Sequence, residues 1–540
     1  MAGDRIGRRE RLRRWWRRKP PYIKKRLVAL AAALGAGLLA LAGWGISNLL
    51  EDEPRCAAGL SWDAETSECY GVTAGADDKP FIEELQPVMR QVEELNQAVE
   101  DDGRSYVTIA LMIPMVPAED DPNLTPRQVL REVQGAYLAV RNANDLQEKG
   151  ADKPRTGSKT LIRLALANPG REMAHWEDVS NDLDKWEGDK KHNLRAVFGF
   201  NLSVKRTEET IDYLTNDKRL PVVGGPITAD TLSNRYKKGR FPGLVKITPD
   251  NLEQAMAIKK EHGVKPETAF RMVDTAAKDI YARDLIAAYE KVTKGTPYPP
   301  EEFDGGNADE GDFTRMVTEL CGARTEGAKP VAADTVFFAG RPRQLSYLLN
   351  ALIGRTCSER HITVISVSGA STLTSVEGAI KWEELQRANV AVEYTTVAHK
   401  NAWKDGAGRK PPPYGGSPRD FDNLEKLVDG RVKTENIGPT SLDDGRTITI
   451  YDSALTAIEG IRTTGEEIPS ADEVRDAWKR LHGKHPVPGA SGWICLDNDG
   501  LPINKAIVVA RLDLEERGIR FKKLVWPAGA PKEECRGRAD

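Results

Sequence analysis

The sequence predicts an α/β protein with two parallel β-sheets, each covered by helices on both faces, preceded by a single transmembrane helix. Three observations lead to this fold class. An uncharged apolar segment lies near the amino terminus, strand and helix patterns alternate over roughly 400 residues after it, and all six cysteines follow it. Single domains usually hold about 100 to 200 residues, so a chain of 540 residues indicates more than one core.

The first part of the chain is basic and the rest is acidic. Residues 1–26 hold twelve Lys or Arg against Asp4 and Glu10, a net charge of +10, whereas the whole chain carries −3 and the remainder therefore −13. This separation of charge argues against nucleic acid as a partner. A composition of 40% hydrophobic and 29% charged residues also excludes a disordered chain and a multi-span membrane protein.

The uncharged segment covers residues 27–50. At about 1.5 Å per residue, a helix of this length crosses the roughly 30 Å of a bilayer core, so we predict a single-pass transmembrane helix in the cell membrane. The basic segment 1–26 is then cytoplasmic by the positive-inside rule, and the main body is extracellular.

A cleaved secretory signal is the alternative, because Ala40, Leu41 and Ala42 form a small-residue cleavage site. The apolar stretch continues beyond that site to Leu50, which favours a retained helix. A lipid anchor is not expected, since Trp44 stands where a lipoprotein needs a cysteine.

The six cysteines indicate three disulfides in an oxidising compartment. Sequence alone permits 15 connectivities. Proximity along the chain favours the pairs Cys56–Cys69, Cys321–Cys357 and Cys495–Cys535.

Residues 51–104 are expected to connect the membrane helix to the body. Residues 51–78 predict a disulfide-closed stalk, and residues 79–101 carry apolar side chains at three- and four-residue steps, which predicts an amphipathic helix. This helix is expected to pack on the body; pairing with a second chain is the alternative.

From residue 105 the pattern alternates between strands and helices. The predicted strands are 107–112, 160–167, 194–200, 220–224, 269–274, 335–338 and 362–367, and the predicted helices are 126–146, 176–186, 208–215, 252–262, 280–292 and 344–353. Near the end, strands 492–497 and 505–512 flank a hairpin turn at Asp499 and Gly500.

Several segments, in order along the chain, resemble the type I periplasmic binding proteins, in particular the branched-chain amino-acid receptors of bacterial ABC transporters. The segment from Gly135 to Asn144 resembles the family's first helix, and Thr248 to Asn251 resembles its crossing into the second lobe. Tyr451 to Ala454 and the segment from Gly489 to Gly500 are similar to its late helix and hairpin. The resemblance covers about residues 105–525.

The resemblance implies two Rossmann-like lobes joined by a three-strand hinge. Lobe 1 would comprise residues 105–255 and 395–487, and lobe 2 residues 256–394 and 488–540. A ligand would be held between the lobes, where strand ends and helix amino termini offer N–H groups.

Carried over residue by residue, the resemblance places Ser203 and Thr228 at hydroxyl positions that hold a ligand carboxylate, with Ile227 offering backbone groups only. Helix N-capping is the alternative for Ser203 and Thr228.

The second lobe departs from the family. Arg341 stands at the position of a cleft aromatic residue, and Ser368 stands where the receptors carry an acid for the ligand's ammonium. An ordinary amino acid is therefore not expected, and an anionic or polyhydroxylated ligand fits Arg341 better. Tyr281 lies in a family-like loop at the rim. The alternative for Arg341 is a solvated loop arginine.

No catalytic motif, phosphate loop, metal site or cofactor site is predicted; the Asp497–Gly500 segment is expected to be a turn rather than a calcium loop. The predicted function is a non-enzymatic, membrane-tethered solute-binding protein that captures a small polar or anionic ligand between closing lobes, with an ABC permease as partner. A ligand sensor with a membrane signalling partner and an assembly protein with the same fold are the alternatives.

Overall fold

The computed structural model describes residues 15–23, 25–26, 56–75, 79–118, 121, 124–148, 160–276, 279–324, 331–375, 380–404, 412, 414–483, 485–533 and 535. The chain divides into two compact units, Met1–Arg55 and Cys56–Asp540. The predicted membrane-spanning segment 27–50 lies outside the described residues. Within the described residues, no helix combines the length and the apolar character needed to span a bilayer.

The second unit contains two seven-stranded sheets, and the first sheet defines lobe 1. Its strand order is β1-β2-β4-β3-β5-β6-β7. The strands are β1 (Leu60–Asp63), β2 (Glu68–Thr73), β3 (Tyr106–Met112), β4 (Leu161–Asn168), β5 (Leu194–Gly199), β6 (Val222–Gly224) and β7 (Leu244–Lys246). Strands β3 to β7 run parallel, as predicted for a sheet buried on both faces, and β1 and β2 form an antiparallel edge.

The expected stalk over residues 51–78 is wrong for the described residues 56–75. Strand β2 pairs with β4 through the partners Gly71↔Asn168 to Thr73↔Leu166, so the β1–β2 hairpin is part of lobe 1. The physical reason is that β4 would otherwise present unpaired backbone groups at a sheet edge.

Helices cover both faces of the first sheet. Helices α3 (Gln86–Asp102), α4 (Pro126–Glu148) and α13 (Arg446–Thr463) lie on one face, and α5 (Trp176–Gly188) and α6 (Lys205–Asp212) on the other. Helices α12 (Pro418–Glu435) and α14 (Ala471–Trp478) complete lobe 1. The amphipathic helix is confirmed as α3, and it packs on α4 and β4 of its own chain.

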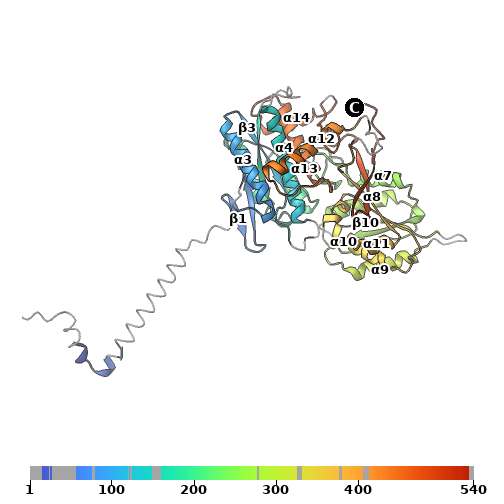
Figure 1. Ribbon diagram of the computed structural model, residues 1–540, viewed down its shortest axis with the longest axis horizontal. Helices are drawn as coiled ribbons and strands as arrows, with labels where there is room; N and C mark the ends of the chain where they lie inside the picture. The colour runs from blue at the N-terminus through green and yellow to red at the C-terminus, as the bar shows by residue number, and fades with distance from the viewer. Residues whose placement is uncertain are drawn as a thin grey trace, which may run out of the picture. The chain divides into compact units, whose positions relative to one another are not determined.

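Helices α4 and α13 lie side by side (Figure 1). Their close approach depends on Gly135, where an added Cβ would come within 2.6 Å of the carbonyl oxygen of Thr447 and 3.1 Å of the backbone nitrogen of Tyr451. A larger residue at this position forces the two helices apart, and both helices contribute residues to the cleft described below.

The second sheet defines lobe 2 and has the order β14-β13-β12-β11-β10-β8-β9. The strands are β8 (Ala269–Asp274), β9 (Glu301–Phe303), β10 (Thr335–Ala339), β11 (Ile362–Ser366), β12 (Val390–Thr396), β13 (Ile507–Asp513) and β14 (Gly518–Val525). Helices α7 (Asn251–His262) and α8 (Ile280–Val292) cover one face, and α9 (Glu310–Gly322), α10 (Pro342–Ile353) and α11 (Trp382–Arg387) cover the other. The two lobes thus have the α/β architecture that the sequence predicts (Figure 1).

The chain passes between the lobes three times: between β7 and α7, between β12 and α12, and before β13. Two of the expected boundaries are displaced. Helix α7 packs on α8, so residues 251–255 belong to lobe 2. The carbonyl oxygen of Gly500 accepts a hydrogen bond from the backbone nitrogen of Lys246 in β7 (2.8 Å), so residues near 500 lie beside the first sheet rather than in lobe 2.

The late hairpin also differs from expectation. Residues 492–497 form no strand but two isolated antiparallel bridges, Val487↔Ile494 and Leu496↔Pro502. A turn does enclose Asp499 and Gly500, with the Asp497 carboxylate accepting from the backbone nitrogens of Asp499 and Leu501 (2.9 Å each). The strand predicted at 505–512 is β13, but its hairpin partner is β14.

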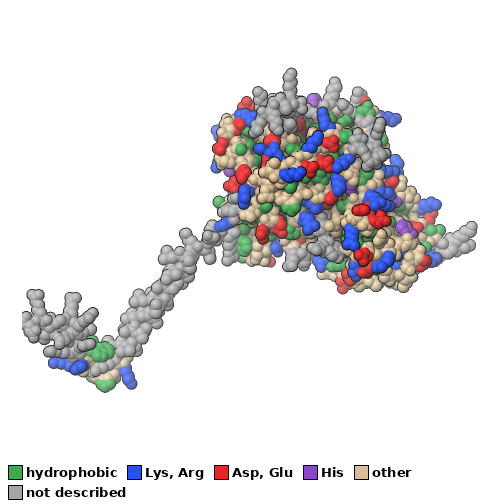
Figure 2. All heavy atoms as spheres, in the orientation of Figure 1, with side chains coloured by type: hydrophobic (Ala, Val, Ile, Leu, Met, Phe, Trp, Pro, Cys, Tyr) green, Lys and Arg blue, Asp and Glu red, His purple; other side chains and the backbone are tan. Residues whose placement is uncertain are grey.

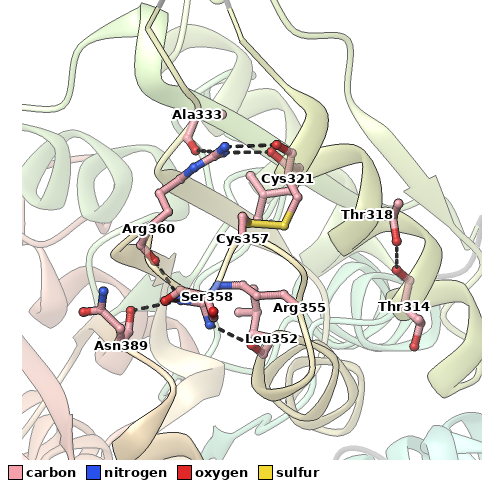
Figure 3. Close-up of a disulfide and its surroundings, with 11 residues drawn as sticks. Thr314, Thr318, Cys321, Ala333, Leu352, Arg355, Cys357, Ser358, Arg360 and Asn389 are labelled. Carbon is pink, nitrogen blue, oxygen red and sulfur yellow. Dashed lines mark hydrogen bonds between the residues drawn. A yellow bond between two sulfur atoms is a disulfide. The ribbon is translucent and has the colours of Figure 1, made fainter.

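The three predicted disulfides, Cys56–Cys69, Cys321–Cys357 and Cys495–Cys535, are confirmed. In lobe 2, Cys321–Cys357 joins α9 to the loop that precedes β11 (Figure 3). Arg360 reinforces this connection by donating to the carbonyl oxygens of Leu320, Cys321 and Ala333 at 2.9 to 3.1 Å.

Acidic and basic side chains are interspersed over the face of Cys56–Asp540 shown in Figure 2. No broad field of one sign gathers on the described part of that face.

Candidate functional site

A cleft opens between the lobes where the carboxyl ends of strands from both sheets meet. Its space amounts to about 710 Å³, part of which is open to solvent. The residues that line it are Glu132, Asn201, Leu202, Ser203, Pro226, Thr228, Tyr281, Arg341, Pro342, Ser371, Thr396, Val397, Asp444, Gly445, Arg446 and Thr449. Ligands of open α/β sheets bind at such strand ends.

Ser203 and Thr228 line the lobe 1 wall, in the loops that follow β5 and β6. Both are almost fully buried, at 4% and 2% exposure. Neither caps a helix: the N-cap of α6 is Val204, and residues 225–250, all of which the structure describes, contain no helix. Helix capping therefore does not account for these two hydroxyl residues.

A buried carboxylate, Glu132 on α4, organises the rest of the lobe 1 wall. Its side chain is fully buried, and its two oxygens bind different neighbours. One accepts a hydrogen bond from the amide nitrogen of Asn201 at 2.6 Å, and the other pairs with Arg446 at the start of α13. Burial raises the pKa of Glu132, and Arg446 and Asn201 oppose that shift.

A second ion pair lies beside the first. Arg131 Nη1 lies 2.5 Å from a carboxylate oxygen of Asp444, whose side chain is fully buried. The other oxygen of Asp444 accepts from the backbone nitrogen of Arg446 at 3.1 Å. Asp444 thereby fixes the first residue of α13, on which the Arg446 side chain depends for its position.

The lobe 2 wall is built around Arg341. Its Nε and Nη2 donate to the two carboxylate oxygens of Asp279 at 2.7 and 2.8 Å. The guanidinium lies over the ring of Tyr281, 4.5 Å from its centre. Burial lowers the pKa of Arg341, but the charge and hydrogen bonds of Asp279 outweigh this effect and the pKa is raised.

The two walls touch through Ser203. Its carbonyl oxygen in lobe 1 accepts from the backbone nitrogen of Tyr281 at 3.1 Å and from Arg341 Nη2 at 3.4 Å, both in lobe 2. These direct bonds describe a closed arrangement of the lobes.

The structure brings together Ser203, Thr228, Tyr281 and Arg341 among the residues that the sequence singled out. Ile227 does not line the cleft: its side chain is buried in the core of lobe 1, and its carbonyl oxygen accepts from the Thr248 hydroxyl at 2.7 Å. Ser368 begins the short 3-10 helix Ser368–Ser375, but its side chain lies outside the description. Ser371 of that helix reaches the cleft instead.

Arg341 is neither a solvated loop arginine nor a free cation. Its side chain is 12% exposed, and its charge is matched by Asp279. The charge of Arg341 alone therefore does not favour an anionic ligand, because a ligand anion would meet a neutralised pair. Within the described residues, no cluster of three or more His, Cys, Asp or Glu side chains is placed to hold a metal ion.

The sequence reasoning missed Glu132, Asn201, Arg446 and Asp279. One signal was present for Asn201, which stands two residues before Ser203 in the same loop. Glu132 and Arg446 are separated by 314 positions along the chain, so only the packing of α4 on α13 brings them together.

No protein-family model matches the chain, and no curated protein matches it in sequence. Solved structures do match in fold. A branched-chain amino acid transporter substrate-binding protein from Streptococcus pneumoniae, in complex with isoleucine, aligns at a TM-score of 0.54 and 16% identity, covering 78% of this chain and all of the other.

A leucine-binding protein from Thermotoga maritima aligns at a TM-score of 0.52 and 15% identity, covering 78% of this chain and 99% of the other. A solute-binding protein of an ABC transporter from Rhodopseudomonas palustris, in complex with p-hydroxybenzoic acid, aligns at a TM-score of 0.53 and 11% identity. The alignment covers 79% of this chain and 98% of the other. The two-lobed architecture expected from the sequence resemblance is thus confirmed as a fold.

Proposed function

We propose that this chain, which has the fold of the type I periplasmic binding proteins, is a membrane-tethered extracellular solute-binding protein without enzymatic activity. The observation that carries the proposal is the convergence of buried polar side chains from both lobes on one cleft. Ser203 and Thr228 contribute from lobe 1 and Tyr281 and Arg341 from lobe 2. A small polar solute that contacts both walls stabilises the closed arrangement by its differential affinity.

The similar structures support this reading, because those named above bind isoleucine, leucine or p-hydroxybenzoate as substrate-binding proteins. Delivery of the solute to an ABC-type permease is the role that we propose for the present chain. Ser203 and Thr228 donate hydrogen bonds to the solute in this scheme, and Ser203 also receives the lobe 2 contacts that accompany closure.

The test uses the full chain purified in mild detergent, with native mass spectrometry to detect a small molecule carried through purification. We expect wild-type protein to retain an adduct and the variant Ser203→Leu/Thr228→Leu to lose it, because two larger apolar side chains fill the cleft. The milder variant Ser203→Ala/Thr228→Val removes only the hydroxyls and is expected to retain at most about a tenth of the adduct, since each lost hydrogen bond costs about 1 kcal/mol.

The control variant is Ser180→Ala/Thr215→Val. These two hydroxyls are also buried in lobe 1, but they donate to carbonyl oxygens of their own helical segments. The control should keep the adduct. Retention of the same adduct by the Ser203→Leu/Thr228→Leu variant contradicts the site.

Membrane tethering is the second part of the proposal. It rests on the uncharged segment 27–50 behind a basic head of net charge +10. We expect the native protein to stay in the membrane fraction after alkaline extraction and to keep its amino terminus. An amino-terminal sequence that begins just after Ala42 would establish cleavage instead.

A further inference from the structure

The lobe 1 wall of the cleft carries one hydrogen-bond acceptor and one donor that the described residues leave without a partner. These are Oδ1 of Asn201 and Nε of Arg446, both buried atoms of side chains that line the cleft. Buried polar atoms are rarely left unsatisfied, so the first atom requires a donor and the second an acceptor.

Glu132 determines which atoms of these two side chains are left over. Its carboxylate only accepts hydrogen bonds, so the Asn201 amide must turn its nitrogen toward Glu132, and its oxygen remains. Arg446 meets the same carboxylate through Nη1, and its Nε remains. Because both neighbours are anchored on one fully buried carboxylate, neither can exchange its role without breaking a bond to Glu132.

The charges of the cleft restrict the ligand further. Each of Arg446, Arg131 and Arg341 is already matched by a carboxylate. A ligand carboxylate at the Asn201 position would set its oxygens against Oδ1 of Asn201, and an ammonium would set its hydrogens against the Arg446 guanidinium. A hydroxyl suits both atoms, because it donates once and accepts twice.

We propose that the solute is a neutral polyhydroxylated molecule, such as a sugar or polyol, whose hydroxyls donate to Asn201 Oδ1 and accept from Arg446 Nε. The side chains of Ser203 and Thr228 provide further hydroxyls in the cleft. Glu132 is a positioning residue that acts through Asn201 and Arg446. This inference rests on the proposed function, and it names the chemistry of the solute.

The experiment measures calorimetric affinity of the full chain in detergent for a fixed panel of probes. Neutral hydroxylated probes are D-glucose, D-ribose, myo-inositol and glycerol, and probes of other classes are L-isoleucine, benzoate and benzamide. We expect binding by at least one hydroxylated probe and by none of the others.

A second step locates the hydroxyl. The best hydroxylated probe is compared with its monodeoxy analogues, and removal of one particular hydroxyl should weaken binding at least tenfold, which corresponds to about 1.4 kcal/mol. The Asn201→Leu variant should bind the parent probe at least tenfold more weakly than wild type does. It should bind the parent probe and that deoxy analogue with equal affinity. Such coupling identifies a direct contact, which a general loss of stability would not produce.

The positioning role of Glu132 is tested by Glu132→Gln, which keeps the shape but no longer fixes the Asn201 amide. We expect the variant to bind the parent probe more weakly. We also expect a smaller difference in affinity between the parent probe and its deoxy analogue. The matched control is Asp145→Asn on the same helix, which also removes a buried carboxylate paired with an arginine, Arg431, away from the cleft. The control should bind as wild type.

Several outcomes overturn the proposal. If isoleucine, benzoate or benzamide binds and the hydroxylated probes do not, the solute class is wrong while the solute-binding function stands. If no probe of any class binds, the proposed solute class and the proposed solute-binding function are both wrong. If every deoxy penalty persists in Asn201→Leu, the contact is wrong.

Discussion

In the lobe 1 wall of the cleft, the carboxylate of Glu132 holds Asn201 and Arg446 and leaves a polar atom of each unsatisfied. In the lobe 2 wall, Arg341 donates two hydrogen bonds to the carboxylate of Asp279, and its guanidinium lies over the ring of Tyr281. Both walls are rich in charge, and the unsatisfied atoms of Asn201 and Arg446 lie in the first. The difference teaches that lobe 1 recognises the solute and lobe 2 closes over it, within the function proposed here.

The two lobes also differ in their covalent links, and this gives the largest expected effect on stability. Cys321–Cys357 encloses 36 positions within lobe 2, whereas Cys56–Cys69 encloses 13 at the edge of lobe 1. Loop-closure entropy predicts losses of about 4 and about 3 kcal/mol when each pair is replaced by serine. Urea unfolding of the two double variants measures these losses.

If lobe 1 recognises the solute, the Cys56→Ser/Cys69→Ser variant should keep its affinity, because the hairpin that it loosens supplies no cleft residue. An equal loss of stability in both double variants would show that loop length does not distinguish the two links. A changed affinity would show that the lobe 1 edge participates in recognition.

The second prediction concerns the ion pair between Arg341 and Asp279 in the lobe 2 wall. Arg341→Met leaves the Asp279 carboxylate without its bidentate partner in a region where both side chains are at most 15% exposed. We expect a loss of about 3 kcal/mol in unfolding free energy, because the remaining charge stays partly desolvated. The double variant Arg341→Met/Asp279→Asn should recover most of that loss.

The same variant also removes the contact from Arg341 to the Ser203 carbonyl oxygen. Small-angle scattering should then show a more open average shape for Arg341→Met. If the double variant is no more stable than the single one, the ion pair does not stabilise the wall as we argue.

The third prediction concerns a carboxyl group at the first crossing between the lobes, whose effect depends on pH. Asp230 of lobe 1 accepts from the backbone nitrogen of Leu252 in α7 at 3.3 Å. Burial, together with the carboxylates of Asp250 and Asp284, raises the pKa of Asp230 to about 7, although Lys246 and the Tyr236 hydroxyl lower it. The folded protein therefore binds a proton here that the unfolded chain releases near pH 4.

Because the folded pKa is the higher one, this group makes the protein less stable as pH rises from about 4 to about 7. Asp230→Asn removes that decline, and we expect the variant to gain at most about 4 kcal/mol over wild type at pH 8 and nothing near pH 4. Chemical denaturation at several pH values measures the difference. A difference that stays constant between pH 5 and pH 8 would assign the effect to packing rather than to titration.

Several long, periodic elements could be predicted from the sequence, although α12 and β12 were missed. The strands at 107–112 and 160–167 and the helix at 126–146 appear as β3, β4 and α4 with small shifts at their ends. Edge strands were missed, because β7 and β9 have three residues each and are too short to show an alternating pattern. The β1–β2 hairpin was taken as a stalk because a local pattern does not show which strand will pair with it.

The residues of the candidate site also divide into those that the sequence indicated and those that only the structure revealed. Ser203 and Thr228 were found because the resemblance to the type I periplasmic binding proteins places them at hydroxyl positions that hold a ligand, and both line the cleft. Arg341 was found in position, but its partner Asp279 lies 62 residues away. The two meet because α8 and α10 begin at the carboxyl ends of the neighbouring strands β8 and β10.

The sequence by itself determined the two α/β sheets and favoured the three disulfide pairs that the structure contains, because hydrophobic periodicity and proximity along the chain are local properties. Only the tertiary structure decided how the charges of the cleft are matched and which polar atoms are left over. Hydrogen bonds such as that between Glu132 and Arg446 depend on directions and distances between side chains from separate helices, and these exist only once the helices have packed on the sheet.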